Sequence, residues 1–491
     1  MAFVKLELPQ GVYNHGTDYE SSGRWNKSNL VRWQDKSLRP VGGWTTRATA
    51  LINETPRAAH AWVDNSYYPH YALGTYNKLY VALVSTGVVT DITPAGFTAG
   101  AVDALENLGW GGSSYGTGAY GVARPSTGVF QEATTWSLDN WGEYLVACSV
   151  DDGKLYEWPL TGIATQITNA PINCLGLIVT DERFLFALGA GGNPRKVQWC
   201  DRENNTDWTP SATNEAGDIE LQTSGEIMRA VRMRGRTLIL TTQDAHIASY
   251  AGPPTVYGFE RVGTSCGVTS RNAVVAVGEG AFWMGRQNFF AFNGSVVQPL
   301  PCEVSDYVFN DLNESQSSKI FAIHNGQFNE IWWFYTSSSS TENDKYVMYD
   351  YKQNIWTVGD LSRTAGFDAG VLTTPIWLDA NGNVYNHEQG HDMNGNVAFV
   401  ESGPINIGAG DNVMHVTQLI PDEKTQGEVT VKLKSRFYPN DTEREYGPYS
   451  MSSPTSLRVT GRQVRIRIEG ENFKDWRVGT MRFDVAQGGK R

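Results

Sequence analysis

Five consecutive residues late in the chain match a metal-binding pattern. His387, Glu388 and His391 stand in the H-E-x-x-H order of zinc proteases. That chemistry needs a helix, on which residues i and i+4 share a face and both imidazoles reach one Zn²⁺. Here "DANGNVYN" (379–386) predicts a hairpin turn leading into a strand, and Gly390 disfavours a helix. We therefore interpret HEQGH as the solvated end of a hairpin and expect no metal and no catalytic role for it.

Two further catalytic patterns overlap in a glycine-rich stretch. "GSSYG" (112–116) fits the nucleophile elbow G-x-S-x-G, and "GTGAYG" (116–121) fits the dinucleotide fingerprint G-x-G-x-x-G. Both need a strand before them and a helix after them. Instead the helix-like run "AVDALENL" (101–108) precedes, and "VARPSTGVF" (122–130) follows with its Pro and Gly. We expect no catalytic residue and no cofactor site in this stretch.

Two charged motifs have structural interpretations. "SVDDGKLYEW" (149–158) resembles an Asp-box hairpin, with Tyr156 where the Trp would be, and such boxes are turns that do not locate a catalytic site. "RMRGR" (232–236) is a basic cluster that could touch phosphate, although a solvated face or an ion-pair site is the commoner role. A glycosidase would need a specific carboxylate pair, and 52 acidic residues do not single one out.

The elements that carry these motifs are predicted to be short strands. The 491 residues include 12% aromatic side chains and 51 glycines, a composition suited to strands joined by tight turns. Five widely spaced cysteines contain no C-x-x-C pair, which favours reduced, buried thiols. No signal peptide or membrane-spanning segment is predicted. The net charge is −12, the sum of −15 in residues 1–410 and +3 in residues 411–491. This acidic balance speaks against a general nucleic-acid binder.

One unit recurs along the chain, a hydrophobic strand, a turn and a second strand with aromatic residues. Equivalent points at Leu155, Val197, Ala245 and Phe289 are separated by 42, 48 and 44 residues, close to the length of a four-stranded propeller blade. We therefore predict an all-β fold, a β-propeller of six or seven blades. The repeats cover residues 70–83, 144–158, 184–199, 238–252, 281–294, 331–351 and 375–388.

Both ends of the chain differ from this repeat. Residues 1–56 contain a predicted hairpin, with strands at 30–33 and 37–41, and are expected to help close the propeller of residues 57–410. In 411–491 the strands alternate strictly, as in "RQVRIRIE" (462–469), which predicts a C-terminal β-sandwich-like extension.

Eight blocks along the chain carry a resemblance to a known family. They are "GRWNKSNLVRWQDKSLRPVGGW" (23–44), "GWGGSSYGTGAYGVARPS" (109–126), "TWSLDNWGEYLVA" (135–147), "NNTDWTPSATNEAGDIEL" (204–221), "WMGRQNFFAFNG" (283–294), "EIWWFYTSSSSTENDKYVMYDY" (330–351), "NVYNHEQGHD" (383–392) and "GRQVRIRIEGENFKDWRVGTMRFDV" (461–485). In these blocks, which span nearly the whole chain in order except residues 1–22 and 302–330, the chain resembles the tail nozzle or tail tubular proteins of short-tailed bacteriophages, including packaged-DNA stabilisation proteins.

The resemblance implies a structural virion protein rather than an enzyme. It implies a homohexameric ring in the virion tail, assembled in the host cytoplasm below the portal-adaptor (head-to-tail connector) proteins and joined by tail fibre, spike or needle proteins. Double-stranded DNA would pass through its channel during ejection. The alternative is a carbohydrate-binding or glycan-hydrolysing propeller that uses its Trp- and Tyr-rich surfaces on host sugars.

An insertion at 96–133 enlarges one blade step and is the candidate interaction segment. Its stretch 109–121 has no charge and contains Trp110, Tyr115 and Tyr120. Interface cores are enriched in aromatic residues and depleted of charge. We therefore predict that these three residues contact neighbouring subunits or line the channel.

Overall fold

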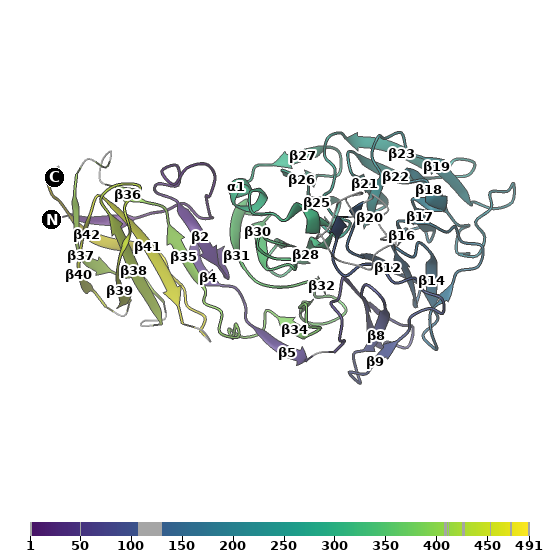
Figure 1. Ribbon diagram of the computed structural model, residues 1–491, viewed down its shortest axis with the longest axis horizontal. Helices are drawn as coiled ribbons and strands as arrows, with labels where there is room; N and C mark the ends of the chain where they lie inside the picture. Colours follow the sequence, from purple (N-terminus) through teal and green to yellow (C-terminus); the bar gives the residue numbers. More distant parts are fainter. Residues whose placement is uncertain are drawn as a thin grey trace, which may run out of the picture.

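The computed structural model describes residues 2–49, 51–106, 130–406, 410, 412–424, 428–451, 453–471 and 474–489. Two bodies of antiparallel strands, a β-propeller and a smaller sandwich, lie end to end along the long axis of the molecule (Figure 1). Helical structure in the described part is confined to α1 (Ser305–Phe309) and the 3-10 helices η1 (Ala190–Gly192) and η2 (Glu314–Lys319). None of these has the length and apolarity of a membrane span.

The propeller has seven four-stranded sheets, within the predicted range of six or seven. The first strand of each sheet contacts the first strand of the next, and the last contacts the first, so the ring closes. The sheets are, in order, β6 (Ala58–Val63) to β9 (Val89–Asp91) with β7 (Pro69–Gly74) and β8 (Leu79–Leu83); β12 (Trp136–Trp141), β13 (Tyr144–Ser149), β14 (Leu155–Trp158) and β15 (Thr165–Gln166); β16 (Gly176–Val179), β17 (Leu185–Leu188), β18 (Lys196–Trp199) and β19 (Gly217–Glu220); β20 (Ile227–Met233), β21 (Arg236–Thr241), β22 (Ala245–Gly252) and β23 (Val256–Gly263); β24 (Val274–Val277), β25 (Gly280–Met284), β26 (Phe289–Phe292) and β27 (Val297–Leu300); β28 (Phe321–Asn325), β29 (Glu330–Tyr335), β30 (Lys345–Asp350) and β31 (Ile355–Asp360); and β32 (Ala365–Phe367), β33 (Ile376–Leu378), β34 (Val384–His387) and β5 (Trp44–Ala48).

Each predicted repeat contains the second and third strands of one blade, from β7–β8 in the first to β33–β34 in the seventh. The seventh blade takes its outer strand from the N-terminal part of the chain: β5 pairs with β34, with Trp44 opposite His387 and Ala48 opposite Val384. The strand that completes the ring is therefore β5, which follows the predicted N-terminal hairpin.

Local chemistry explains the blade hairpins. All six residues of β29 (EIWWFY) are buried, because both faces of this strand pack against neighbouring strands and blades. The Asp-Gly and Asn-Gly turns stand where the sequence predicts them, with Gly153 and Gly382 at φ of 65° and 71°.

The helix-like run at 101–108 is not helical where it is described. Leu105 and Glu106 form the strand β10 (Leu105–Glu106), which pairs with β11 (Phe130–Gln131). Tertiary pairing has overridden a short helical pattern that lacks an N-cap and flanking turns.

The sandwich combines strands from both ends of the chain. One sheet has the order β1 (Ala2–Leu6), β42 (Met481–Gln487), β37 (Met414–Ile420) and β40 (Thr455–Gly461), so the first and last strands pair. The other has the order β2 (Trp25–Asn29), β35 (Phe399–Ser402), β41 (Gln463–Gly470), β38 (Val429–Arg436) and β39 (Arg444–Ser450), and β36 (Ile405–Asn406) also pairs with β41. Val464, Ile466 and Ile468 of β41 are buried in the core, as the alternation predicts.

Strand pairing divides the chain earlier than residue 410. The last propeller strand ends at His387, whereas β35 at 399–402 already pairs with β41 of the sandwich. Between the two bodies lies the hairpin β3 (Val31–Gln34) and β4 (Ser37–Pro40), whose turn residues Asp35 and Lys36 both have positive φ. A single buried hydrophobic cluster continues from the sixth blade into the sandwich.

The five cysteines are free thiols, four of them buried and Cys302 half-buried. Burial raises the pKa of Cys174 and Cys200 to about 12. Thiols so far from ionisation are poor nucleophiles, which agrees with the predicted reduced, buried state.

Candidate functional site

The predicted interaction residues Trp110, Tyr115 and Tyr120 lie outside the described residues, as do the patterns GSSYG and GTGAYG. The structure does describe both ends of the insertion at 96–133. They leave and re-enter the propeller between β9 and β12, and they meet through β10 and β11, with Leu105 opposite Gln131. We call the described residues 98–106 and 130–135 the insertion root.

The insertion root is tied first to the blades that flank it. The Thr98 amide donates to Asp152 Oδ1 at 2.9 Å, and the Gly100 amide donates to the Tyr76 carbonyl at 2.8 Å. Thr134 donates from its hydroxyl to Asp151 Oδ2 at 2.7 Å, and its amide donates to the Ala101 carbonyl at 3.0 Å. The outgoing and returning arms are thus bonded to each other and to the second blade.

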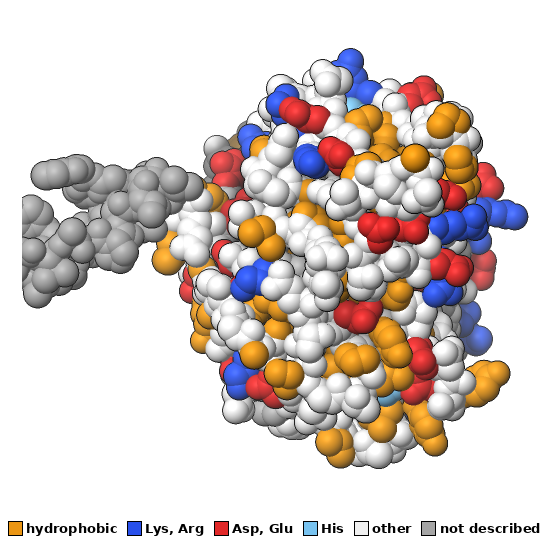
Figure 2. All heavy atoms as spheres, turned by 90° about the vertical axis from the view of Figure 1, so that its right-hand side faces the viewer, with side chains coloured by type: hydrophobic (Ala, Val, Ile, Leu, Met, Phe, Trp, Pro, Cys, Tyr) orange, Lys and Arg blue, Asp and Glu red, His pale blue; other side chains and the backbone are white. Residues whose placement is uncertain are grey.

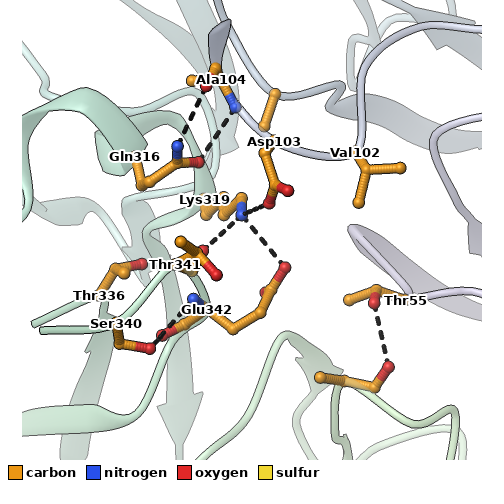
Figure 3. A network of polar contacts seen from close by, with 12 residues as sticks. Thr55, Val102, Asp103, Ala104, Gln316, Lys319, Thr336, Ser340, Thr341 and Glu342 are labelled. Carbon is orange, nitrogen blue, oxygen red and sulfur yellow. Dashed lines mark hydrogen bonds and ion pairs between the residues drawn. The ribbon is translucent and has the colours of Figure 1, made fainter. Parts of the chain in front are cut away.

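The 3-10 helix η2 holds both arms from another part of the ring, and Figure 3 shows its contacts with the outgoing arm. Gln316 accepts the Ala104 amide at 3.0 Å and donates to the Ala104 carbonyl at 3.2 Å, as a neighbouring strand would. The Ala133 amide donates to Ser318 Oγ at 3.1 Å. Because η2 precedes the sixth blade, the insertion root connects the first and second blades to a distant part of the ring.

A network of buried charges completes this anchor. The side chain of Lys319 has no exposed surface, and its ammonium donates to Asp103, to the Thr341 carbonyl and, at 3.1 Å, to Glu342. Arg57 binds Glu342 through both terminal nitrogens and donates to the Val102 carbonyl at 3.0 Å. Two cations and two carboxylates therefore fix Val102 and Asp103 of the insertion root, and fully bonded networks of this kind are rigid.

A second network of buried charges joins the propeller to the N-terminal hairpin. Arg32 Nε lies 2.7 Å from Glu330 Oε1, and Arg32 Nη2 lies 2.6 Å from Glu388 Oε1. The side chains of Arg32, Glu330 and Glu388 are 2%, 3% and 5% exposed. Asn325 and Trp332 add donors to these carboxylates. The hairpin, the sixth blade and the segment that leads to the sandwich therefore meet at one point.

The protonation of this junction follows from its burial. Burial raises the pKa of Glu330 to about 7, and the attraction of Arg32 only partly offsets that effect. Burial also opposes the charge of Arg32, but Glu330 and Glu388 outweigh it and raise the pKa of the guanidinium. Two carboxylates that share one cation in a dry site hold their last proton more tightly than in water.

Within the HEQGH motif, His387 and the Glu388 side chain are buried and paired, so the interpretation as a solvated hairpin end is wrong for these two residues, whereas Gly390 is exposed. His387 lies between Trp377 and Trp44, with ring centroids 3.9 and 5.2 Å away, and its Nε2 accepts from Arg363 Nε at 3.1 Å. Burial and the neighbouring Arg363 lower the pKa of His387 well below the usual range. Glu388 follows the strand at a φ of 58° and binds Arg32. Sequence spacing pointed to these residues, but their contacts are structural.

The remaining motifs also have structural partners. Tyr156 donates to Asp152 Oδ2 at 2.5 Å and closes the turn of the Asp-box-like hairpin. Arg232 of the basic cluster lies 3.3 Å from Asp139, as expected for an ion-pair site, and Arg234 is 83% exposed. Across the described ranges, no group of three or more His, Cys, Asp or Glu side chains is arranged to hold a metal ion.

Sequence reasoning missed the anchor residues Gln316, Lys319 and Arg57. Gln316 and Lys319 fall in 302–330, which matched neither the repeat nor the family resemblance. Lys319 and Asp103 are separated by 216 residues. No local pattern can indicate a pair at that distance.

Comparison with known proteins gives a fold-level picture only. No family model and no curated protein matches the chain. Among solved structures, virginiamycin B lyase from Staphylococcus aureus is 7% identical with a TM-score of 0.42, over 70% of this chain and 98% of that one. A chain of a mitotic checkpoint complex is 10% identical, with a TM-score of 0.41 over 70% and 94%. A streptogramin B lyase is 8% identical, with a TM-score of 0.41 over 68% and 95%.

Proposed function

We propose that this chain is a structural protein of the virion tail of a short-tailed bacteriophage, the tail nozzle. In this role it forms a ring-shaped conduit below the portal-adaptor, retains packaged DNA and lets it exit during ejection. The proposal starts from the ordered sequence resemblance along the chain. It assigns the molecule no enzymatic reaction.

The observation that carries the proposal is the anchoring of the insertion root. Gln316, Ser318 and Lys319 hold both arms of a 96–133 insertion against the propeller. An insertion that served only as a loose surface loop would not need two buried cations at its base, because desolvating charges is costly. A rigid base is useful when the segment beyond it, with its uncharged aromatic stretch, must meet a partner at a fixed place.

The rest of the molecule fits a passive conduit. The junction of Arg32, Glu330 and Glu388 and the continuous core restrain the propeller and sandwich from moving independently. Residues 1–410 carry a net charge of −15, which disfavours tight binding of DNA phosphates and favours sliding. Figure 2 shows acidic and basic side chains interspersed over the propeller end, rather than a continuous basic patch.

The partners follow from this role. A closed ring repeats one heterologous contact around its axis, and the sequence resemblance implies six copies, so we propose a homohexamer. It would dock on the portal-adaptor ring and carry tail fibre, spike or needle proteins, in a virion tail assembled in the host cytoplasm.

Negative-stain electron microscopy of the purified full chain, alone and mixed with portal-adaptor complexes, tests the proposal. We expect rings that seat on the adaptor. Lys319→Met is the matched variant, because it weakens the insertion root without touching the sandwich, and Lys352→Met is its exposed control. A protein that stays monomeric at high concentration and ignores adaptor complexes would contradict the proposal. Turnover of a host glycan, lost on changing one carboxylate, would favour the sugar-active alternative.

A further inference from the structure

The propeller has a partly open cavity of about 130 Å³ on its axis. Six of the seven inner strands, all except β16, contribute to its wall, with small side chains such as Ala58, Ala322 and Ala365. The cavity has room for several water molecules. It can admit a small ion, whereas a nucleotide is too large.

Besides Arg57, which is paired with Glu342, the charged side chain in this wall is Arg229. It belongs to β20, whose pairing with β21 shifts register between Ile227 and Arg229. A bulge of this kind re-aims the side chains beside it, and Arg229 and Val231 both line the cavity. Arg229 is half-buried, and part of its uncovered surface lines the cavity.

Arg229 lacks a counter-ion, unlike the other arginines near the axis. Its Nη1 donates to Ser137 Oγ at 2.9 Å and to the Trp136 carbonyl at 3.5 Å. By contrast, the other three arginines near the axis each have a carboxylate partner. The pairs are Arg57–Glu342, Arg232–Asp139, Arg232–Asp181 and Arg271–Glu132. Of the carboxylates that the structure describes, none lies within 4.0 Å of the Arg229 nitrogens.

The surrounding charged groups do not compensate the positive charge of Arg229. Burial lowers the pKa of Arg229, Asp139 partly offsets this effect, and the like charge of Arg271 adds to it. Asp139 is already committed, because its oxygens accept from Arg232 and from the amides of Asn140 and Val179. A guanidinium stays protonated in proteins, so Arg229 is a half-buried cation without a counter-ion among the described residues.

We propose that the axial cavity is a binding site for a small tetrahedral oxyanion, phosphate or sulfate, held by Arg229. Hydrogen bonds from Arg229 Nε and Nη2, which make no hydrogen bond to a described residue, would bind two oxygens of the ion. Guanidinium forks match oxyanion geometry, and charge-assisted hydrogen bonds are stronger than neutral ones. Arg57 and Asn272 are further polar groups in the cavity wall.

Isothermal titration calorimetry and thermal unfolding of the full chain in chloride buffer, with inorganic phosphate or sulfate added, test the site. We expect both ions to bind and raise Tm, because a ligand that binds only the folded state stabilises it. Acetate and added chloride should have much smaller effects, because neither presents a tetrahedral set of oxygens. Arg229→Gln should weaken phosphate binding at least tenfold, and the exposed arginine variant Arg236→Gln should bind phosphate like the wild type.

Arg229→Lys keeps the positive charge and provides a second test of the site if the Arg229→Gln variant does not fold. It should bind phosphate several-fold more weakly than the wild type, because a lysine lacks the planar fork. Absence of a calorimetric and Tm response of the wild type to phosphate and sulfate would overturn the proposal. So would equal binding by wild type and Arg229→Lys, or an acetate response as large as that of phosphate.

Discussion

At the scale of single residues, two buried cations hold distant parts of the chain together. The side chains of Lys319 at the insertion root and Arg32 at the junction are 0% and 2% exposed, and each contacts two carboxylates. Removing one member of a buried pair is far more costly than removing a surface charge, because the partner stays desolvated without compensation. Both sites therefore make quantitative predictions.

Lys319→Met should lower the free energy of unfolding by about 1–3 kcal/mol, because the Thr341 carbonyl and the partly exposed carboxylate of Asp103 lose their donor. Chemical denaturation at neutral pH measures this loss. Lys352→Met, at an exposed position, is the control and should change stability by no more than about 0.5 kcal/mol. Similar stabilities of the two variants would show that the insertion root does not depend on Lys319.

Glu330 should make the junction less stable as the pH rises. Its pKa is about 7 in the folded protein against 4.5 as an ordinary glutamate. A raised folded-state pKa gives stability that is complete below the unfolded pKa and is lost as the pH rises through the folded one. The contribution lost between pH 4.5 and pH 7 is roughly 3 kcal/mol.

Glu330→Gln isolates this contribution, because other carboxylates, such as Asp152 and Glu401 with lowered pKa values, act in the opposite direction in both proteins. The difference in unfolding free energy between wild type and Glu330→Gln, measured by urea denaturation from pH 4.5 to 8, should shift against the wild type as the pH rises. A difference that is constant with pH would refute the raised pKa.

At the scale of elements, hairpins with defined turns build both bodies. The turn of the β3–β4 hairpin places Asp35 and Lys36 at φ of 50° and 68°. This backbone suits a two-residue turn between twisted strands, but it strains any residue with a Cβ. The hairpin carries Arg32 between the propeller and the sandwich, so its stability bears on the junction.

Lys36→Gly should stabilise the protein by about 0.5–1 kcal/mol. Relief of the left-handed strain at Lys36 is worth about 1–2 kcal/mol, and the added chain entropy of glycine takes back roughly half of it. Thermal unfolding of the variant measures the gain. Lys36→Ala keeps the Cβ and should bring no comparable gain; equal stabilisation by both changes would show that side-chain contacts, not backbone strain, decide this position.

At the scale of the whole molecule, the ring of seven blades depends on strands, whereas assembly is proposed to depend on the insertion. The insertion root contacts the propeller through residues 98–104 and 133–134, which lie outside the stretch 109–121. The two tasks, folding and assembly, are therefore separable by mutation.

Replacing residues 109–121 with a short Gly-Ser linker should leave Tm within a few degrees of the wild type and impair ring assembly or infectivity. Size-exclusion chromatography with electron microscopy reads out the rings, and calorimetry reads out the fold. A variant of unchanged length with Trp110, Tyr115 and Tyr120 all changed to Ser separates aromatic content from loop length and should show the same defect. Normal rings and normal DNA ejection from virions carrying the truncated chain would mean that the insertion is dispensable.

The sequence by itself determined the features that neighbours along the chain encode. Strand alternation, turn residues and the spacing of the hairpins are local, so all seven hairpins, the β3–β4 turn and the buried face of β41 could be predicted from it. The two-residue pairing at Leu105 and Glu106 was missed because a short segment has no period of its own to distinguish a strand from a helix.

Only the tertiary structure decided which polar residues are buried and what they meet. Ring closure brings Lys319 to Asp103 across 216 residues and Arg32 to Glu388 across 356. The HEQGH residues have the spacing of a zinc site, but in the folded protein His387 contacts Arg363 and Glu388 contacts Arg32. The physical reason is that burial and ion pairing depend on contacts between residues far apart in the sequence, and these contacts form only when the chain folds. The spacing of residues along the chain carries no information about them.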